Sequence, residues 1–243
     1  MSISFKKAML SPYRDEKWKT KVGIAILLYV PGFIAALTLG VNNPAALILT
    51  FIASVIIGGF TTVFGHKEIN NEEPPLPDWD FGQIITVALK SWLIGIVYFL
   101  MFLPLFIIVF AISGVDRSYF IISLLFSVPL FIFAFIFIGV AQSLFMKNLV
   151  MADAFNFKVA VSYLKTGISN YGMYLVFSIL AGIIYGLAGG VLAGAFTKII
   201  NPQVGNLINN VTNILLALTT VNLLAQAYKS TTEKHPKEHL SEA

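Results

Sequence analysis

Long uninterrupted runs of apolar residues dominate the chain and alternate with shorter polar segments. Six of these runs reach about 18 residues or more, the length that separates a membrane-spanning helix from a buried core helix. None of them alternates apolar and polar residues with the period of two that a spanning β-strand requires. We therefore predict an all-α, polytopic membrane helix bundle with six transmembrane helices, at residues 22–39, 45–64, 91–113, 119–146, 171–196 and 206–228.

Three further segments combine apolar residues at helical spacing with basic residues. They are residues 3–21, 81–90 and 157–170. One apolar stripe beside a basic face is typical of a helix that lies flat on a membrane surface. We therefore expect three interfacial amphipathic helices on the cytoplasmic side, with Ser11-Pro12 breaking the first of them.

This order of elements suggests how the chain is organised. Residues 1–228 are expected to form one membrane domain, which can be divided into three parallel repeats of a surface helix followed by two spans. The repeats would be residues 1–64, 65–148 and 149–228. Residues 229–243 are mostly polar and contain Pro236, so they are expected to form a disordered cytoplasmic tail.

The connection between the second and third runs contains Glu-Glu-Pro-Pro-Leu-Pro-Asp-Trp-Asp, residues 72–80, which we call the strap. Its three prolines fix φ and exclude a helix, so we predict a stiff, extended segment. Asp80 has the chemistry of an N-cap, and Gln83 three residues later completes a capping box. Trp79 is placed to pack against Ile84 as a hydrophobic staple. The strap is therefore predicted to start the next helix.

Composition and charge support a membrane protein and predict its orientation. Hydrophobic residues make up 57% of the chain and charged residues 12%, against about 25% charged residues in soluble domains. Of the 16 Lys and Arg residues, all but Arg117 and Lys198 lie in the termini or in alternate connections. The positive-inside rule then places both termini in the cytoplasm. Anionic lipid headgroups account for the net charge of +4, so we expect the lipid bilayer as a partner and no nucleic acid.

Residues 5–21, which we call the leader, and the strap also resemble a known family. The leader contains Tyr-Arg-Asp-Glu-Lys-Trp at residues 13–18, and the strap contains Leu-Pro-Asp-Trp-Asp at residues 76–80. Together with the six spans, these elements resemble a prokaryotic family of multi-spanning membrane proteins, catalogued as domain of unknown function number four thousand and thirteen. The resemblance covers residues 5–228. It implies a protein of a bacterial or archaeal plasma membrane, with no assigned activity, catalytic residue or cofactor.

Residues that carry chemistry are scarce in this chain. The absence of cysteine excludes disulfides, thiol catalysis and cysteine-based metal sites. Ionisable residues are nearly absent from the six runs, which argues against ion-coupled pumping and against acid–base catalysis. His235 and His239 have a spacing typical of metal ligands, but Pro236 between them opposes a helix. We therefore expect no catalytic site, no metal site and no cofactor.

The sixth run carries one polar face. Its members at helical spacing are Asn206, Asn209, Asn210, Asn213 and Thr220. Amide side chains in hydrocarbon must be hydrogen-bonded, so this face should point into the bundle or toward a polar cavity. This face either forms hydrogen bonds between helices or lines a path for a polar or amphipathic ligand.

Small residues and prolines mark the packing of other runs. The fifth run carries a stripe of small residues at Gly182, Gly186, Gly189 and Ala193. This stripe predicts close packing against the sixth run, with homodimerisation or a hinge as alternatives. Three prolines inside spans are expected to kink their helices, namely Pro31, Pro104 and Pro129.

Two functions fit these features. The first is a non-catalytic scaffold or accessory subunit that binds protein partners at the cytoplasmic membrane face. Its partner-contact candidates are Leu76, Pro77, Asp78, Trp79 and Asp80. The alternative is a passive carrier or channel for a lipid or amphipathic small molecule, lined by the fifth and sixth spans. An intramembrane enzyme is disfavoured because paired acid and base groups are missing.

Overall fold

The computed structural model describes residues 3–40, 42–113 and 117–234, with side chains described over the same ranges except 108–124 and 234. Within these ranges the regular elements are all helices and no strand occurs. In chain order they are α1 Phe5–Leu10, the 3₁₀ turn η1 Ser11–Arg14, α2 Trp18–Leu27, α3 Val30–Leu39, α4 Pro44–Asn70, α5 Phe81–Ser113, α6 Arg117–Asn148, α7 Met151–Ala154, α8 Phe157–Ile199 and α9 Pro202–Lys234. The fold is all-α, as the apolar runs predict.

Six helical stretches of the described chain are long and apolar enough to cross a membrane. They are Trp18–Leu39, Pro44–Asn70, Phe81–Ile107, Leu125–Asn148, Phe157–Ile199 and Pro202–Glu233. Each overlaps one of the six runs predicted from the sequence. The prediction of a multi-pass membrane protein with six candidate spans is therefore confirmed.

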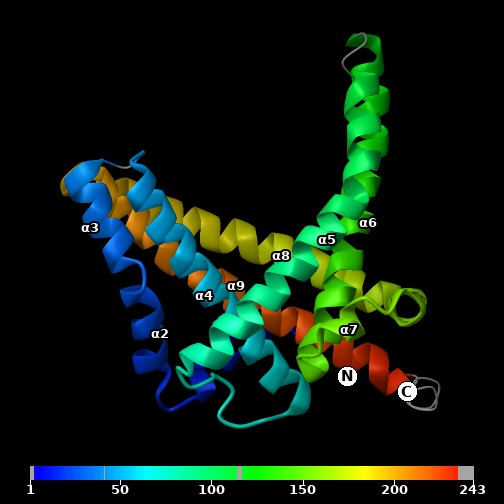
Figure 1. The fold of residues 1–243 in the computed structure, drawn as a ribbon, viewed down its shortest axis with the longest axis horizontal. Helices are drawn as coiled ribbons and strands as arrows, with labels where there is room; N and C mark the ends of the chain where they lie inside the picture. The colour runs from blue at the N-terminus through cyan, green and yellow to red at the C-terminus, as the bar shows by residue number, and fades with distance from the viewer. Residues whose placement is uncertain (1–2, 41, 114–116, 235–243) are drawn as a thin grey trace.

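Figure 1 shows how these helices are arranged. α8 and α9 run side by side in opposite directions, and α4 packs against both α9 and α5. α3 lies beside α4. The far halves of α5 and α6 form a hairpin that leaves the other helices and projects alone. The molecule therefore has two arms that meet at one end.

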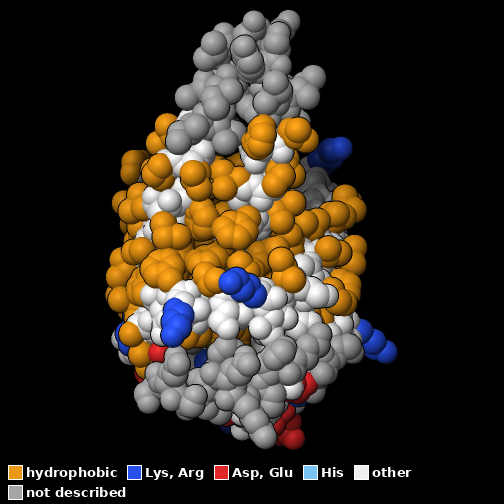
Figure 2. Space-filling view, turned by 90° about the vertical axis from the view of Figure 1, so that its right-hand side faces the viewer, with side chains coloured by type: hydrophobic (Ala, Val, Ile, Leu, Met, Phe, Trp, Pro, Cys, Tyr) orange, Lys and Arg blue, Asp and Glu red, His pale blue; other side chains and the backbone are white. Residues whose placement is uncertain are grey.

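The end where the arms meet carries most of the charged side chains, and we call it the charged end. There the short helix α1 packs against the C-terminal half of α9, so both ends of the described chain lie close together. Figure 2 shows a broad hydrophobic belt across one face of the molecule, with most of the coloured charged side chains gathered below it. This distribution is the one that a bilayer imposes on a spanning protein.

Two of the predicted surface helices are not separate elements. Residues 81–90 continue without a break into span three as α5, and residues 157–170 continue into span five as the 43-residue helix α8. Both helices continue through the junction, and one polar side chain at each junction has a partner on a neighbouring helix. Ser91 Oγ lies 3.1 Å from Gln142 Oε1, and Asn170 Nδ2 donates to Thr231 Oγ1 at 3.0 Å.

Proline breaks occur where the sequence predicts two of them. α1 ends at Leu10, and Pro12 lies in the 3₁₀ turn that follows. Span one is interrupted between α2 and α3, where Pro31 lacks the N–H that would continue the ladder. Pro104 and Pro129 lie inside helices that continue past them, α5 and α6.

The predicted start of the disordered tail at residue 229 is too early. α9 continues to Lys234, and Ser230 and Thr231 are buried. The reason is a close helix contact, since a Cβ added at Gly167 of α8 would lie 2.4 Å from Thr231 Oγ1. Residues 235–243, which include His235 and His239, lie outside the described residues.

Candidate functional site

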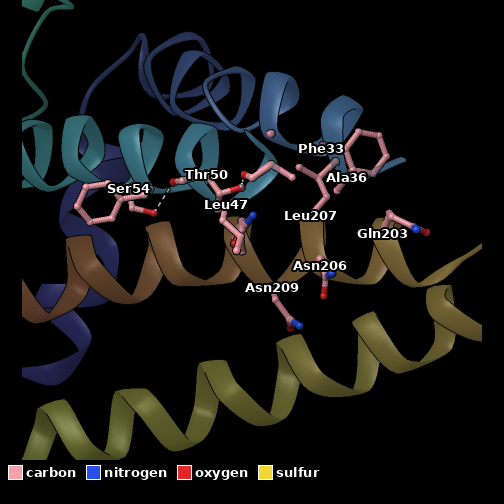
Figure 3. Close-up of a pocket in the computed structure, with 13 residues that line it drawn as sticks. Phe33, Ala36, Leu47, Thr50, Ser54, Gln203, Asn206, Leu207 and Asn209 are labelled. Atoms are coloured by element: carbon pink, nitrogen blue, oxygen red, sulfur yellow. Dashed lines mark hydrogen bonds between the residues drawn. The ribbon is translucent and has the colours of Figure 1, made fainter. Parts of the chain in front are cut away.

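A groove lies between α3, α4 and α9, in the half of the molecule away from the charged end (Figure 3). Its volume is about 410 Å³. The lining residues are Gly32, Phe33 and Ala36 from α3, Ala46, Leu47, Thr50, Phe51 and Ser54 from α4, and Gln203, Asn206, Leu207, Asn209 and Asn210 from α9. The groove thus has apolar walls on α3 and α4 and a row of amide side chains on α9.

Close helix contacts position these walls. A Cβ added at Gly32 would lie 2.6 Å from Thr50 Oγ1, so α3 and α4 touch at this point. On the other side of α9, a Cβ at Gly205 would lie 2.1 Å from Thr197 Oγ1 and 2.9 Å from the carbonyl oxygen of Ala193. α9 is therefore held against α8 by one face, which leaves the amide side chains on a neighbouring face free to line the groove.

The hydroxyl groups of the α4 wall are already engaged as donors. Thr50 Oγ1 donates to the carbonyl oxygen of Ala46 at 2.8 Å, and Ser54 Oγ donates to that of Thr50 at 2.9 Å. The hydroxyl of Tyr29 lies 3.2 Å from Ser54 Oγ. Because their hydrogens point to the helix backbone, Thr50 and Ser54 present only acceptor lone pairs to the groove.

The amides on the α9 wall have no such partners. Within the described part of the chain, the side chains of Gln203, Asn206, Asn209 and Asn210 make no hydrogen bond. Asn206 and Asn209 are exposed, and in Figure 3 their side chains point away from α3 and α4, whereas Gln203 and Asn210 are half-buried. Since a carboxamide offers two N–H donors and one carbonyl acceptor, the wall carries unused donors and acceptors together.

The predicted polar face of span six is therefore divided. Asn206, Asn209 and Asn210 line the groove, whereas Asn213 is exposed outside it and Thr220 is half-buried further along α9. Helical spacing shows which residues share a face of α9. It does not show which part of that face lies against α3 and α4, and this contact determines which asparagines line the groove.

The predicted packing stripe on α8 is also divided. Gly189 and Ala193 are buried, and a Cβ at Gly189 would lie 2.8 Å from Thr212 Oγ1 of α9. Gly182 and Gly186 do not pack against another helix of the described chain, because a Cβ at either would meet nothing within 4 Å. At that level Tyr185 reaches α9 instead, with its hydroxyl 3.1 Å from Thr219 Oγ1.

The strap is the second region that the sequence singles out, and it lies against the protein itself. Leu76 and Pro77 are buried and Trp79 is half-buried, which leaves Asp78 and Asp80 as the exposed members of the predicted partner-contact set. The ring of Trp79 stacks on Phe60 of α4. The apolar side chains of the strap are therefore used within the chain.

Lys21 fixes the strap to the leader. Its buried Nζ lies 2.9 Å from Asp15 Oδ2 and 2.9 Å from Asp78 Oδ1, and it donates to the carbonyl oxygen of Leu76 at 2.8 Å. All three ammonium hydrogens are thus used. The hydrogen bond and the charge of Lys21 lower the pKa of Asp78 below its usual value. Trp79 Nε1 completes the attachment by donating to the carbonyl oxygen of Lys21 at 2.9 Å.

Asp80 acts as the predicted N-cap. Its Oδ1 accepts the backbone N–H groups of Gly82 at 3.0 Å and Gln83 at 3.2 Å. The reciprocal half of the predicted capping box does not form, because the N–H of Asp80 donates to the carbonyl oxygen of Asp78 at 2.9 Å. The strap therefore starts α5 through a single cap.

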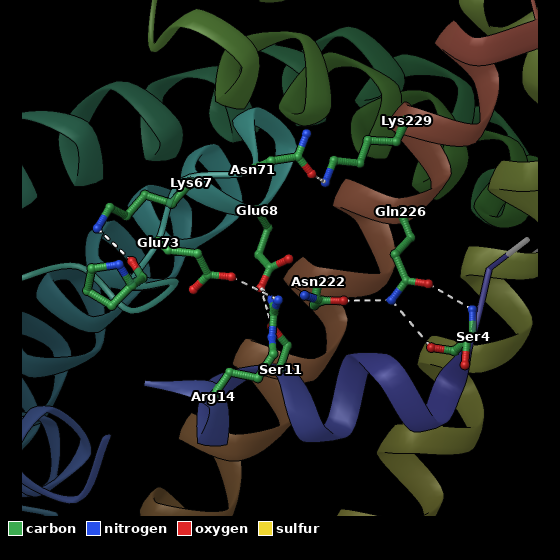
Figure 4. A network of polar contacts seen from close by, with 11 residues as sticks. Ser4, Ser11, Arg14, Lys67, Glu68, Asn71, Glu73, Asn222, Gln226 and Lys229 are labelled. Carbon is green, nitrogen blue, oxygen red and sulfur yellow. Dashed lines mark hydrogen bonds and ion pairs between the residues drawn. The ribbon is translucent and has the colours of Figure 1, made fainter. Parts of the chain in front are cut away.

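A polar network joins the leader to α4 and α9 at the charged end (Figure 4). The buried carboxylate of Glu68 accepts hydrogen bonds from Ser11 and Arg14. Gln226 Oε1 accepts the N–H of Ser4 at 2.7 Å, and Gln226 Nε2 donates to the carbonyl oxygen of Ser4 at 3.3 Å. Glu68 and Gln226 were not predicted from the sequence. The only sequence feature that could have indicated them is that each is a polar residue near the end of an apolar run.

Metal-binding groups do not gather in the described ranges. No three His, Asp or Glu side chains lie close enough together there to hold a metal ion. His66 Nδ1 lies 2.7 Å from the carbonyl oxygen of Met146, which is a contact between helices.

Comparison with known proteins identifies the family. Residues 43–194 match the family model described as protein of unknown function (DUF4013), which is more than half of the chain. The chain belongs to the DUF4013 family. No curated protein and no solved structure matches it.

The DUF4013 match covers only part of the two regions described above. It includes the strap and the α4 wall of the groove, with Thr50 and Ser54. The amides of α9 and the leader residues that hold the strap lie outside it. The confirmed resemblance thus establishes the family, while the groove has to be interpreted from its own chemistry.

Proposed function

We propose that this DUF4013 protein is a passive carrier that binds a lipid or another amphipathic molecule in the groove between α3, α4 and α9. The observation that carries the proposal is the row of amides without hydrogen-bond partners inside a candidate membrane span. Leaving polar groups unpaired in hydrocarbon costs several kcal/mol each, roughly. A bound polar headgroup would supply the missing partners, and the adjoining apolar walls would take its chain.

The size of the groove fits this role. Its volume of about 410 Å³ falls within the roughly 300–1,000 Å³ typical of small-molecule sites. None of its 13 lining residues, all of them described, is ionisable. Coupling to a proton gradient needs a titratable group in the path, so the groove supports movement that is not coupled to protons.

The scaffold hypothesis has less support than the carrier. It depends on the strap as a surface for a protein partner, and Leu76, Pro77 and Trp79 make their contacts within the chain. Of the five predicted contact residues only Asp78 and Asp80 are exposed, and Asp78 is paired with Lys21. A partner at this face would have to recognise these carboxylates and the surrounding lysines.

We also propose that the charged end faces the cytoplasm of a prokaryotic cell, with the protein in the plasma membrane. The support is the distribution of Lys and Arg along the chain, which favours the cytoplasm for both termini. The groove would then open in the outer leaflet.

The test of the carrier is transbilayer movement in liposomes. The full chain is reconstituted into phosphatidylcholine liposomes containing acyl-labelled fluorescent lipids of several headgroups, and dithionite quenching reports how fast each lipid crosses. We expect at least one headgroup to cross faster than in protein-free liposomes. The triple variant Asn206→Leu, Asn209→Leu, Asn210→Leu should abolish the gain.

The control is Asn213→Leu, an exposed asparagine of the same helix that lies outside the groove. It should keep the wild-type rate, and thermal unfolding in detergent should confirm that both variants are folded. Equal rates for the wild type and the triple variant would rule out the groove as the path.

A further inference from the structure

We infer that the occupant of the groove is a neutral glycolipid, a diacylglycerol whose headgroup is an uncharged sugar. This inference rests on the proposed function and adds the chemical class of the ligand. It follows from the charge of the lining, from the direction of its hydrogen bonds and from its depth in the span.

The absence of charge in the lining argues against a phosphate headgroup. An anion removed from water needs a cation or several converging donors to offset the loss of hydration. The groove offers amides and hydroxyls but no Lys, Arg or His among its described lining residues. Lys198, near the same end of the molecule, is exposed on the last turn of α8 and does not line the groove.

The hydrogen-bond directions select a headgroup that donates. The hydroxyl groups of Thr50 and Ser54 donate to backbone carbonyl oxygens of α4, so a ligand can bind them only by donating a hydrogen bond. Asn210 on the facing wall offers donors and an acceptor together. A sugar hydroxyl both donates and accepts, and therefore matches both walls. A choline headgroup has no O–H or N–H to donate and leaves the acceptors of both walls unpaired.

The depth of the groove fits one leaflet of a bilayer. Ser54 lies ten residues after the first residue of α4, Pro44, which corresponds to about 15 Å along a helix. This is half of the roughly 30 Å hydrocarbon thickness of a bilayer. Phe33 and Phe51 also line the groove and would lie against acyl chains, so the ligand is a lipid and not a free sugar.

The test compares lipids that share their acyl chains. The full-length protein in detergent is titrated by native mass spectrometry with glucosyl dioleoylglycerol, dioleoyl phosphatidylglycerol and dioleoyl phosphatidylcholine. Phosphatidylglycerol is the matched probe, because it carries hydroxyl groups together with a negative charge. We expect the glucosyl lipid to bind about tenfold more tightly than either phospholipid, which corresponds to one net hydrogen bond.

Two variants connect the preference to the groove. Thr50→Val removes the acceptor oxygen at nearly constant volume, and Asn210→Leu removes the facing amide. Each should lower the affinity for the glucosyl lipid about tenfold and leave phosphatidylcholine binding unchanged, whereas Asn213→Leu should change neither. Methyl glucoside at millimolar concentration should not displace the glucosyl lipid.

The outcomes separate this inference from the proposed function. Binding that depends on Thr50 and Asn210 but favours phosphatidylglycerol would overturn the neutral class and leave the carrier standing. Displacement by methyl glucoside would overturn the lipid assignment. Lipid binding that no groove variant changes would overturn both the class and the groove itself.

Discussion

The indole of Trp79 lies nearly parallel to the ring of Phe60, with ring centroids 4.4 Å apart and planes inclined by 11°. Phe60 is fully buried in α4, and the same indole donates its N–H to the backbone of Lys21. One side chain of the strap therefore joins the leader to α4, and removing it should loosen all three segments.

Trp79→Ala should lower the free energy of unfolding by about 2–4 kcal/mol, because it removes both the stacked ring and the indole hydrogen bond. Thermal unfolding of the detergent-solubilised protein measures the change. Trp92→Ala is the matched control, since Trp92 is 52% exposed and touches Phe51 only by its edge. The control should change stability by less than about 1 kcal/mol. Equal losses in the two variants would contradict the anchoring role of Trp79.

Gly59→Ala should destabilise the protein although alanine favours helices. The new Cβ would lie 2.2 Å from the carbonyl oxygen of Ile84 and 2.8 Å from the Cβ of Ala88, so α4 and α5 would have to separate. We expect a loss of about 1–3 kcal/mol, measured by thermal unfolding. Gly58→Ala is the control, because its Cβ would meet nothing within 4 Å. This neighbouring change should be neutral or stabilising by up to about 1 kcal/mol, and a destabilised Gly58→Ala would contradict the contact geometry.

Asp78 should make the stability depend on pH in the acidic range. Its pKa in the folded protein is lowered by Lys21, so its contribution is present above the unfolded pKa of about 3.9 and is lost as the pH falls through the lowered value. The effect is small, since the Asp78 side chain is 87% exposed and open to screening by salt. The difference in unfolding temperature between the wild type and Asp78→Asn should be present at pH 7 and shrink below about pH 4. A difference that instead grew on acidification would have the wrong sign.

The proposed orientation can be tested directly because the chain has no cysteine of its own. Glu16→Cys places one thiol at the exposed surface of the charged end, and Asn42→Cys places one at the opposite end. In intact cells, a membrane-impermeant maleimide should label Asn42→Cys, and should label Glu16→Cys only after the membrane is opened. The reverse pattern would place the charged end outside.

The sequence predicts the number of candidate spans and their helical type well, because the length of an apolar run can be read directly from neighbouring residues. The N-cap at Asp80 and the break at Pro12 are also local, and both are found. The prediction that residues 81–90 and 157–170 form helices separate from spans three and five was wrong. A helical stripe beside polar residues looks the same whether the polar side chains face water or, as Asn170 does, a neighbouring helix.

The site depends on contacts that local patterns do not contain. Leu76 is at the centre of a sequence element that looks exposed, yet a lysine 55 residues earlier binds its carbonyl oxygen and the side chain is fully buried. Gln203 was missed because it lies before the predicted start of span six, whereas the helix begins at Pro202. Thr50 and Ser54 could have been found as two hydroxyl residues four positions apart in an otherwise apolar stretch.

The hydrogen bonds between Ser4 and Gln226 join residues separated by 222 positions, and this separation orders the events of biosynthesis. The leader leaves the ribosome before its docking site on α9, on the order of ten seconds or more earlier. During that interval the leader has no docking site on the protein. The leader can therefore dock at the charged end only after α9 has been made, and a chain truncated before Gln226 would lack these hydrogen-bond partners of Ser4.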